Sequence, residues 1–224
     1  MTYLIAIEGI DGSGKGTQAQ RLYDRFSASG KSAAILSFPR YSETLFGKAI
    51  GDYLNGRFGT LQEVSPFLAA LLYAGDRFES RDFLLETLKD NEVVILDRYT
   101  ASNLAHQGSK LDGAERREIV DWIRRIEYEI YQLPRPDLVV LLDLPVLEAQ
   151  KLIATKQARS YTDKAFDLQE ADTAYLEGVR NVYLELAEEE PNWCKIDCWR
   201  SNAMRSIEEI GEEIWNVVNS RRNA

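Results

Sequence analysis

The order of apolar and polar positions along the chain predicts strands that alternate with helices. Residues 3–8 alternate in polarity and predict a first strand, and residues 32–38 predict a second. The continuous apolar runs at residues 93–96 and 138–142 are typical of strands buried on both faces of a parallel sheet. Alternation at residues 193–198 indicates a fifth strand. We therefore expect a three-layer α/β/α fold with a central parallel sheet of about five strands.

Helical periodicity separates the expected strands. We expect Gly30 to end the helix that follows the first strand. Residues 43–90 are predicted to be mainly helical, since Pro66 can stand in the first turn of a helix. Ser201 is a candidate N-cap for the last helix. The apolar faces comprise Ala19, Leu22, Tyr23 and Phe26, then Ile119, Trp122, Ile123, Ile126 and Ile130, and finally Ile207, Ile210, Ile214 and Val217.

Length and composition favour one globular domain over residues 1–224, of which 45% are hydrophobic. The chain has no run of about 18 apolar residues that would cross a membrane, and its first residues predict a strand rather than a signal peptide. Cys194 and Cys198 lie in the expected fifth strand, where they predict neither a disulfide framework nor a zinc site. We therefore expect a cytoplasmic protein.

Acidic residues outnumber basic ones, with 36 Asp and Glu against 27 Lys and Arg and a net charge of −9. Such a balance argues against tight binding to a nucleic-acid polymer. An acidic protein that binds a small anionic ligand must instead gather its cations locally.

A glycine-rich segment supplies the first candidate site. Residues 9–15, Gly-Ile-Asp-Gly-Ser-Gly-Lys, match the P-loop pattern between an expected strand and an expected helix. The glycines let backbone N–H groups approach phosphate oxygens, and Lys15 places a charge on the β and γ phosphates. A plain glycine-rich turn is the alternative. The expected ATP-binding residues are Gly9, Asp11, Gly12, Ser13, Gly14, Lys15, Gly16 and Thr17.

The end of this segment departs from the general pattern. Gly16 stands where a Ser or Thr would contact Mg²⁺, and Thr17 follows it. This ending resembles that of adenylate kinases, which implies that Mg²⁺ is held largely through waters, phosphates and carboxylates. The P-loop therefore favours a nucleotide kinase with the P-loop NTPase fold over a GTPase.

Asp97 and Arg98 follow directly on the apolar run at residues 93–96. A carboxylate there can bind Mg²⁺ through water, and the guanidinium offers a planar fork to phosphate oxygens. A salt-bridged strand end is the alternative.

Several motifs occur together in one order. They are Glu8–Lys15, Phe38-Pro39-Arg40-Tyr41, Asp76-Arg77, Asp97-Arg98-Tyr99 with Ser102-Asn103, and Pro134-Arg135-Pro136-Asp137. In their order and spacing the chain resembles the thymidylate kinases over nearly its whole length. The resemblance implies transfer of the γ-phosphate of ATP to dTMP, Mg²⁺ as cofactor, and a homodimer.

The resemblance also implies individual roles. Tyr73 would stack on thymine, Arg77 would donate to its O4 carbonyl, and Asn103 would both donate to and accept from the N3–O4 edge. Core packing is the alternative for Tyr73, and a surface pair with Asp76 is the alternative for Arg77. The implied dTMP-binding residues are Asp11, Phe38, Arg40, Tyr41, Tyr73, Arg77, Arg98, Asn103, His106 and Gln107.

Three of these residues carry further expectations. Asp11 would lie near the 3′-hydroxyl of the acceptor and the metal. Phe38 is expected to pack at the edge of the core as well as near the ligand. His106, the one histidine, stands where the family usually has tyrosine near C2′ of the sugar. The sequence therefore does not decide whether the site rejects ribonucleotides. A role as general base is the alternative for His106.

Residues 151–170 gather lysine and arginine in this acidic chain and match the lid of nucleotide kinases. Family members that lack an arginine in the P-loop, as here with Gly12, take their catalytic cation from the lid. Arg159 is the first candidate and Lys164 the second. A solvated basic helix end is the alternative. The implied catalytic residues are thus Lys15, Asp11, Arg98, Arg159 and Lys164, and the implied metal ligands Asp11, Asp97 and Glu170.

Two rival functions stay open on the sequence. The nearer one is a deoxynucleoside-monophosphate kinase with a broader choice of base. The other is a P-loop protein that binds nucleotide to switch a partner, and slow ATP hydrolysis without dependence on an acceptor would mark it.

Replacing Lys15 with alanine is expected to abolish phosphoryl transfer, because the variant lacks the charge that holds the β and γ phosphates. Steady-state ADP formation with dTMP as acceptor measures this, with circular dichroism to confirm the fold. Retained transfer in a folded Lys15→Ala variant would refute the P-loop assignment.

Overall fold

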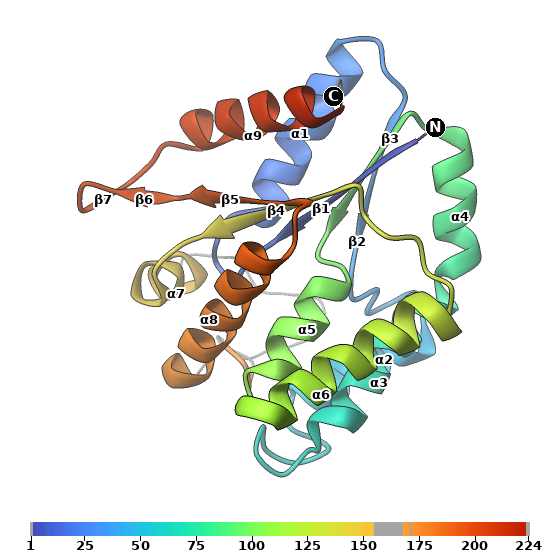
Figure 1. Cartoon of the computed structure of the whole chain (residues 1–224), viewed down its shortest axis with the longest axis vertical. Helices are drawn as coiled ribbons and strands as arrows, with labels where there is room; N and C mark the ends of the chain where they lie inside the picture. Colours follow the sequence, from blue (N-terminus) through green and yellow to red (C-terminus); the bar gives the residue numbers. More distant parts are fainter. Residues whose placement is uncertain (1, 155–167, 171, 223–224) are drawn as a thin grey trace.

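A five-stranded parallel sheet forms the centre of the protein, as the sequence predicts. The computed structural model describes residues 2–154, 168–170 and 172–222. Within them the main sheet has the strand order β2-β3-β1-β4-β5 (Figure 1). Its strands are β1 (Tyr3–Glu8), β2 (Ala33–Ser37), β3 (Val93–Asp97), β4 (Leu138–Asp143) and β5 (Trp193–Asp197).

Register and burial explain the apolar runs. Ile5 of β1 pairs with Ile95 of β3 on one side and with Leu138 of β4 on the other. All three side chains are almost entirely removed from solvent. A strand covered on both faces cannot alternate apolar and polar residues, so the continuous runs are what this position requires.

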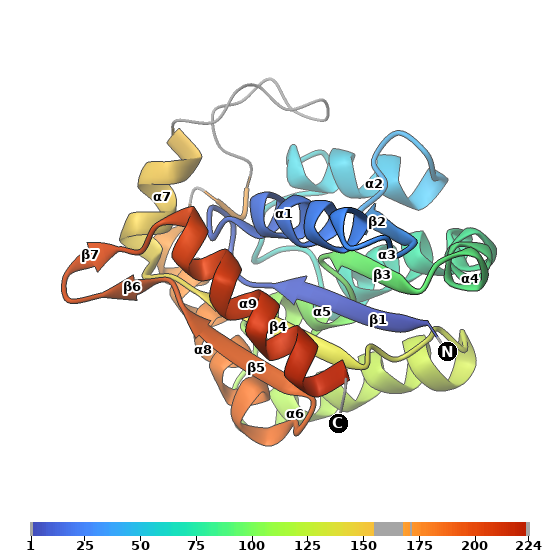
Figure 2. The same cartoon turned by 90° about the horizontal axis from the view of Figure 1, so that it is seen from above.

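Helices cover both faces of the sheet (Figures 1 and 2). On one face, α1 (Lys15–Ala28) and α9 (Ile207–Arg222) contact each other and the strands; on the other, α4 (Arg81–Asp90) and α8 (Thr173–Glu189) contact β3 and β4–β5. This division follows from right-handed crossovers between parallel strands. The remaining described helices are α2 (Leu45–Leu54), α3 (Pro66–Glu79), α5 (Thr100–Gly108), α6 (Gly113–Arg124), the π-helix η1 (Arg125–Ile130) and α7 (Val146–Ala154).

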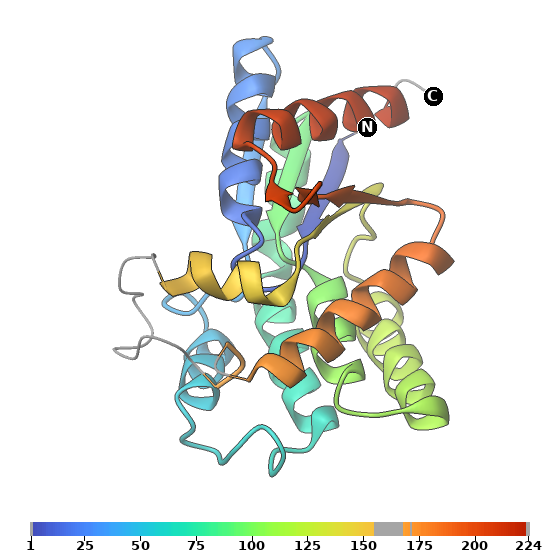
Figure 3. The ribbon, with the colours of Figure 1, turned by 90° about the vertical axis from the view of Figure 1, so that its left-hand side faces the viewer.

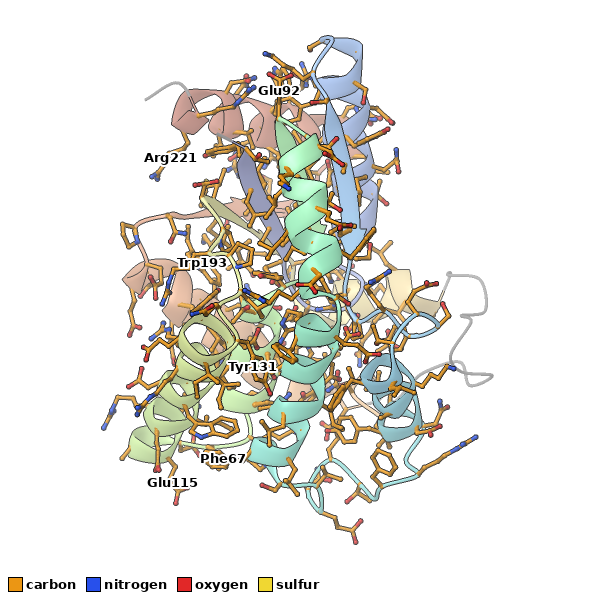
Figure 4. All side chains as sticks on the ribbon, turned by 90° about the vertical axis from the view of Figure 1, so that its right-hand side faces the viewer. Phe67, Glu92, Glu115, Tyr131, Trp193 and Arg221 are labelled. Carbon is orange, nitrogen blue, oxygen red and sulfur yellow. The ribbon has the colours of Figure 1, made fainter. Side chains whose placement is uncertain are left out.

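The strands point from one end of the molecule toward a group of helices at the other. Figure 3 shows α9 at the first end and α3, α5, α6 and α8 at the second. In Figure 4, Glu92 and Arg221 mark the end where β3 begins, and Phe67 and Glu115 mark the opposite end. The carboxyl ends of the strands therefore open onto a region enclosed by α2, α3 and α5, which is where a parallel sheet binds ligands.

The stretch 43–90 is mainly helical, as predicted, although turns at residues 55–65 separate α2 from α3. Two other local expectations need correction. The face predicted through Ile130 continues beyond α6 as a π-helix rather than an α-helix. Ser201 does not cap α9, since it lies in the turn of a short hairpin, β6 (Trp199–Arg200) and β7 (Ala203–Met204), with φ of 51°.

Ser206 caps α9 in its place. Its Oγ accepts a hydrogen bond from the Glu209 N–H at 3.1 Å, and the Glu209 carboxylate accepts one from the Ser206 N–H at 2.9 Å. This reciprocal pair is the capping box, which satisfies two N–H groups at the start of a helix.

Two smaller observations complete the fold. Cys194 and Cys198 are both free thiols; Cys194 lies in β5 as expected, whereas the buried Cys198 follows directly after the end of that strand. Among the described residues, none of the helices is both long enough and apolar enough to cross a membrane.

Candidate active site

The P-loop lies between β1 and the N-terminus of α1. Gly14 precedes the helix with φ of 89°, in the left-handed region that favours glycine, and Lys15 is its first residue. The Lys15 side chain is buried, and its Nζ donates to the Ile10 carbonyl oxygen at 2.8 Å. The ammonium group is thus folded over the loop whose N–H groups surround an anion in such motifs.

Gly12 allows the P-loop to approach α7 closely. A Cβ built on Gly12, whose φ is 83°, would lie 2.3 Å from the carbonyl oxygen of Ala149 in α7. A backbone carbonyl in a helix cannot move aside as a side chain can. The position is therefore closed to arginine or any other side chain, which gives the absence of a P-loop arginine a structural cause.

Gly16 allows Asp97 to reach the P-loop. A Cβ at Gly16 would lie 3.1 Å from Asp97 Oδ2. The other oxygen, Oδ1, is buried and has no hydrogen-bond partner among the described residues. An unpartnered buried carboxylate oxygen is costly, and a cation would satisfy it.

Arg98 links β3 to the P-loop. Its backbone has a φ of 66°, and its guanidinium forms an ion pair with the Asp11 carboxylate and donates to the Gly9 carbonyl oxygen and Ser102 Oγ. Burial alone would raise the pKa of Asp11, but Arg98 and Lys15 outweigh it and hold that pKa well below its usual range. Asp11 is therefore ionised at neutral pH and can accept hydrogen bonds or bind a cation.

Two adjoining cavities share this ion pair. The phosphate-side cavity is lined by Asp11, Gly12, Gly14, Lys15, Gly16, Thr17, Ser37, Phe38, Pro39, Tyr41, Asp97 and Arg98. The second is lined by Asp11, Phe38, Pro39, Tyr41, Leu54, Tyr73, Arg77, Arg98, Tyr99, Ser102, Asn103, His106, Gln107 and Gln169. Asp11 and Arg98 line both cavities, so the two cavities meet beside this ion pair. A donor phosphate in one cavity and an acceptor phosphate in the other would meet there.

A buried polar cluster forms the far wall of the second cavity. Arg77 Nε and Nη2 both donate to the Glu127 carboxylate at 2.6 Å. Asn103 Nδ2 donates to Glu127 Oε1 at 2.9 Å and to the Ala70 carbonyl oxygen at 3.0 Å, which leaves Asn103 Oδ1 without a partner among the described residues. The asparagine can therefore offer only an acceptor to a ligand.

Two further polar side chains of α5 line this cavity. His106 Nδ1 lies 2.9 Å from the Tyr175 hydroxyl, and burial, together with the positive charge of Arg98, lowers the pKa of His106 to about 3. Gln107 is fully buried, and neither of its amide atoms finds a partner within the described parts of the chain. Such an amide is satisfied only by a ligand or by water.

The chain is similar in sequence and in structure to proteins of one family. The model of the thymidylate kinase family matches residues 7–214. A probable thymidylate kinase of Thermococcus onnurineus is 37% identical over 220 residues, which cover 96% of each chain. The chain belongs to the thymidylate kinase family.

Other members of the thymidylate kinase family agree. The Mycobacterium tuberculosis enzyme is 36% identical over 82% of this chain and 85% of its own, and the human enzyme is 31% identical over 94% of this chain and 87% of its own. A solved thymidylate kinase of Candida albicans, described as having broad substrate specificity, is 25% identical with a TM-score of 0.75. It covers 99% of this chain and 93% of its own.

Most residues that the thymidylate kinase motifs single out line one of the two cavities. Tyr73 and Phe38 do so, although Phe38 is also part of the core. Arg77 does not pair with Asp76 at the surface; it is buried and pairs with Glu127.

Arg40 is placed differently from the expectation. Its guanidinium donates to Ser80 Oγ and lies 4.5 Å from the centre of the Phe83 ring, outside the lining of either cavity. Glu170 is buried and is likewise absent from both linings. Arg159 and Lys164 lie outside the described residues.

Several cavity residues carry no signal in the sequence. Leu54 and Gln169 come from a helix end and from the segment before α8, and only folding brings them to the cavity. Glu127, which lies behind the cavity wall, carries no signal either, because its partner Arg77 is 50 residues away in the sequence. Tyr99 and Ser102 stand inside a recognised motif, so their position at the site could have been found.

The buried histidine should make stability depend on pH. The pKa of His106 falls from its ordinary 6.5 to about 3 on folding, so the unfolded chain binds a proton that the folded chain does not. Its contribution is complete above pH 6.5 and is lost as the pH falls toward 3. Between about pH 6.5 and 5 the loss reaches up to about 2 kcal/mol.

Urea unfolding of the wild type and of His106→Gln at about pH 7 and pH 5 measures this contribution. The free energy of unfolding should fall more steeply with decreasing pH in the wild type than in the variant. Equal slopes would show that folding does not lower the pKa of His106.

Proposed function

We propose that the protein transfers the γ-phosphate of ATP to dTMP, giving dTDP and ADP. The observation that carries this proposal is the polarity of the second cavity, which opens onto the P-loop at Asp11 and Arg98. Its far wall presents a fixed acceptor from Asn103 beside a cationic donor from Arg77.

This polarity matches thymine. The base carries an N3–H donor next to an O4 acceptor, so Asn103 Oδ1 accepts from N3–H while Arg77 Nη1 donates to O4. Nη1 is free for this role because Nε and Nη2 donate to Glu127 among the described residues. Cytosine has the opposite pattern, with an unprotonated N3 and an amino group, and would set acceptor against acceptor and donor against donor.

The remaining cavity residues complete the nucleoside site. Tyr73 stacks on the base, and Phe38 and Tyr41 line the path to the phosphate. Gln107 gains hydrogen-bond partners from the ligand that its buried amide otherwise lacks. His106 is neutral at physiological pH and shapes the sugar end of the site; with a pKa of about 3 it is too weak a base to activate the acceptor.

Phosphoryl transfer depends mainly on positioning and on charge. Lys15 and the P-loop N–H groups hold the donor phosphates, and Arg98 holds the acceptor phosphate beside Asp11. We propose a single domain over residues 1–224, with residues 151–170 as its lid. Within the proposed lid, Arg159 is the first candidate for the catalytic cation and Lys164 the second. The exclusion of a side chain at Gly12 supports a cation supplied from outside the P-loop.

Mg²⁺ fits the carboxylates beside the P-loop. Asp97 Oδ1 is buried without a partner among the described residues, and ionised Asp11 lines the same cavity, so these two would hold the ion; Glu170 is a further candidate. Mg²⁺ takes one or two protein carboxylates together with waters and phosphates. When bound, it neutralises charge on the donor phosphates.

The family resemblance also supports a cytoplasmic homodimer. Exposed apolar side chains on α2, α3 and the π-helix suit an interface, notably Phe46, Leu68 and Ile130. Phe67 packs on Trp122 within the chain, at a ring-centre distance of 5.2 Å, and so belongs to the contact between α3 and α6.

A panel of acceptors tests the proposed reaction. The value of kcat/KM for dTMP should exceed that for dCMP at least about hundredfold, because a site built for one hydrogen-bonding pattern rejects the reverse. The dUMP value should fall within about tenfold of that for dTMP, since only one methyl group differs. A preference for dCMP or a purine nucleotide would overturn the substrate, and ATP hydrolysis indifferent to acceptor would support a nucleotide switch instead.

A further inference from the structure

Glu127 lies behind the base-recognising residues without lining the cavity itself. Its side chain is fully buried and accepts four hydrogen bonds, two from Arg77 and one each from Asn103 and Thr100. The Thr100 Oγ1 donates at 2.8 Å. One carboxylate thus joins α3, α5 and the π-helix.

The backbone around Glu127 is unusual. The residue stands in the π-helix η1, and π-helical turns are frequently found at functional sites. After this segment the Tyr131 N–H donates to the Ile126 carbonyl oxygen, and the Leu133 N–H donates to the Glu127 carbonyl oxygen. The Tyr131 ring also packs on Phe78 of α3, with ring centres 4.5 Å apart. The backbone of the segment that carries Glu127 is therefore held by its own hydrogen bonds, and its side chains hold it against α3.

The carboxylate controls the orientation of the asparagine amide. An ionised carboxylate only accepts, so it selects the Asn103 rotamer in which Nδ2 faces Glu127 and Oδ1 is turned away. The Ala70 carbonyl oxygen favours the same orientation. The reversed amide would set Oδ1 against two acceptors.

The same carboxylate also orients the arginine. The carboxylate accepts hydrogen bonds from Nε and Nη2 of Arg77, which fixes the plane of the guanidinium group and leaves Nη1 on the side away from Glu127. Burial on its own would lower the pKa of Arg77, but Glu127 raises it above its ordinary value, so the donor stays charged.

We infer that Glu127 is the positioning residue that sets the choice between thymine and cytosine, by fixing which polar atoms of Arg77 and Asn103 meet the base. The inference rests on the proposed function, since it concerns the base of the acceptor nucleotide. Glu127 does not touch the substrate. It acts through the two side chains that do.

Glu127→Gln is the variant that tests this role. A glutamine amide has one acceptor and one donor, so it cannot accept from Arg77 at both nitrogens and from Asn103 at the same time. The donor end of the glutamine then favours the reversed asparagine, which presents Nδ2 to the base. Nδ2 can donate to the unprotonated N3 of cytosine, whereas it opposes the N3–H of thymine.

The readout is kcat/KM for dTMP and for dCMP on the full-length protein. In Glu127→Gln the ratio of the two values should fall about tenfold or more, because a charge-assisted hydrogen bond that selects one orientation is lost. The matched control is Glu129→Gln, on the same π-helix but exposed and paired only with Arg125 at 3.8 Å among the described residues. The control should keep the wild-type ratio.

A merely structural role would lower both values together and leave the ratio unchanged. That result, with the wild type still preferring dTMP, would overturn the inference but not the proposed function. A wild type with no preference for dTMP would instead refute the proposed function.

Proton exchange in the wild type gives a second test, should Glu127→Gln fail to fold. With dTMP bound, the side-chain NH₂ protons of Asn103 should exchange slowly with solvent in NMR spectra, because Glu127 and Ala70 hold them. Exchange of those protons as fast as in a solvent-exposed asparagine amide would contradict the inference.

Discussion

The ion pair between Arg98 and Asp11 is the interaction around which the site is arranged. It joins the residue after β3 to the P-loop after β1, and so fixes two neighbouring strand ends to each other. Because both residues line the two cavities, the pair also stands where donor and acceptor phosphates meet. The low pKa of Asp11 follows from this contact, because the Arg98 guanidinium and Lys15 favour the ionised carboxylate. A cation at this junction lets a chain of net charge −9 bind two anions.

Two buried ion pairs hold the site among the described residues, Arg98 with Asp11 and Arg77 with Glu127, and the second positions the groups that face the base. Removing the carboxylate alone from the Arg77–Glu127 pair would leave an uncompensated buried charge, at a cost of about 3–5 kcal/mol. Because breaking the pair is so unfavourable, Glu127 holds the Arg77 guanidinium in place at the cavity before any nucleotide binds. Glu8, also fully buried, accepts from the Tyr99 N–H and the Ser102 hydroxyl in the same way and fixes the start of α5. Preorganised polar groups need little rearrangement when the substrate arrives.

The sequence predicts local features better than long-range contacts. Polarity patterns locate all five main strands: burial on both faces dictates the apolar runs of β3 and β4, and alternation marks β1 and β5. The P-loop glycines reveal the phosphate site. The orientation of Arg40 depends on Ser80 and Phe83, some forty residues away in sequence, and no local pattern encodes such a contact. The same holds for Glu127 and for the approach of α7 to Gly12. The hairpin that displaces Ser201 from its expected cap is too short to give a periodic signal.

The most direct test of the account is a crystal structure with dTMP and a non-hydrolysable ATP analogue. The account predicts that thymine N3 lies within hydrogen-bond distance of Asn103 Oδ1 and that O4 lies within reach of Arg77. It also predicts the dTMP phosphate beside Arg98, facing the γ-phosphate over Lys15. A base bound away from Arg77 and Asn103, or an acceptor phosphate remote from Arg98, would contradict it.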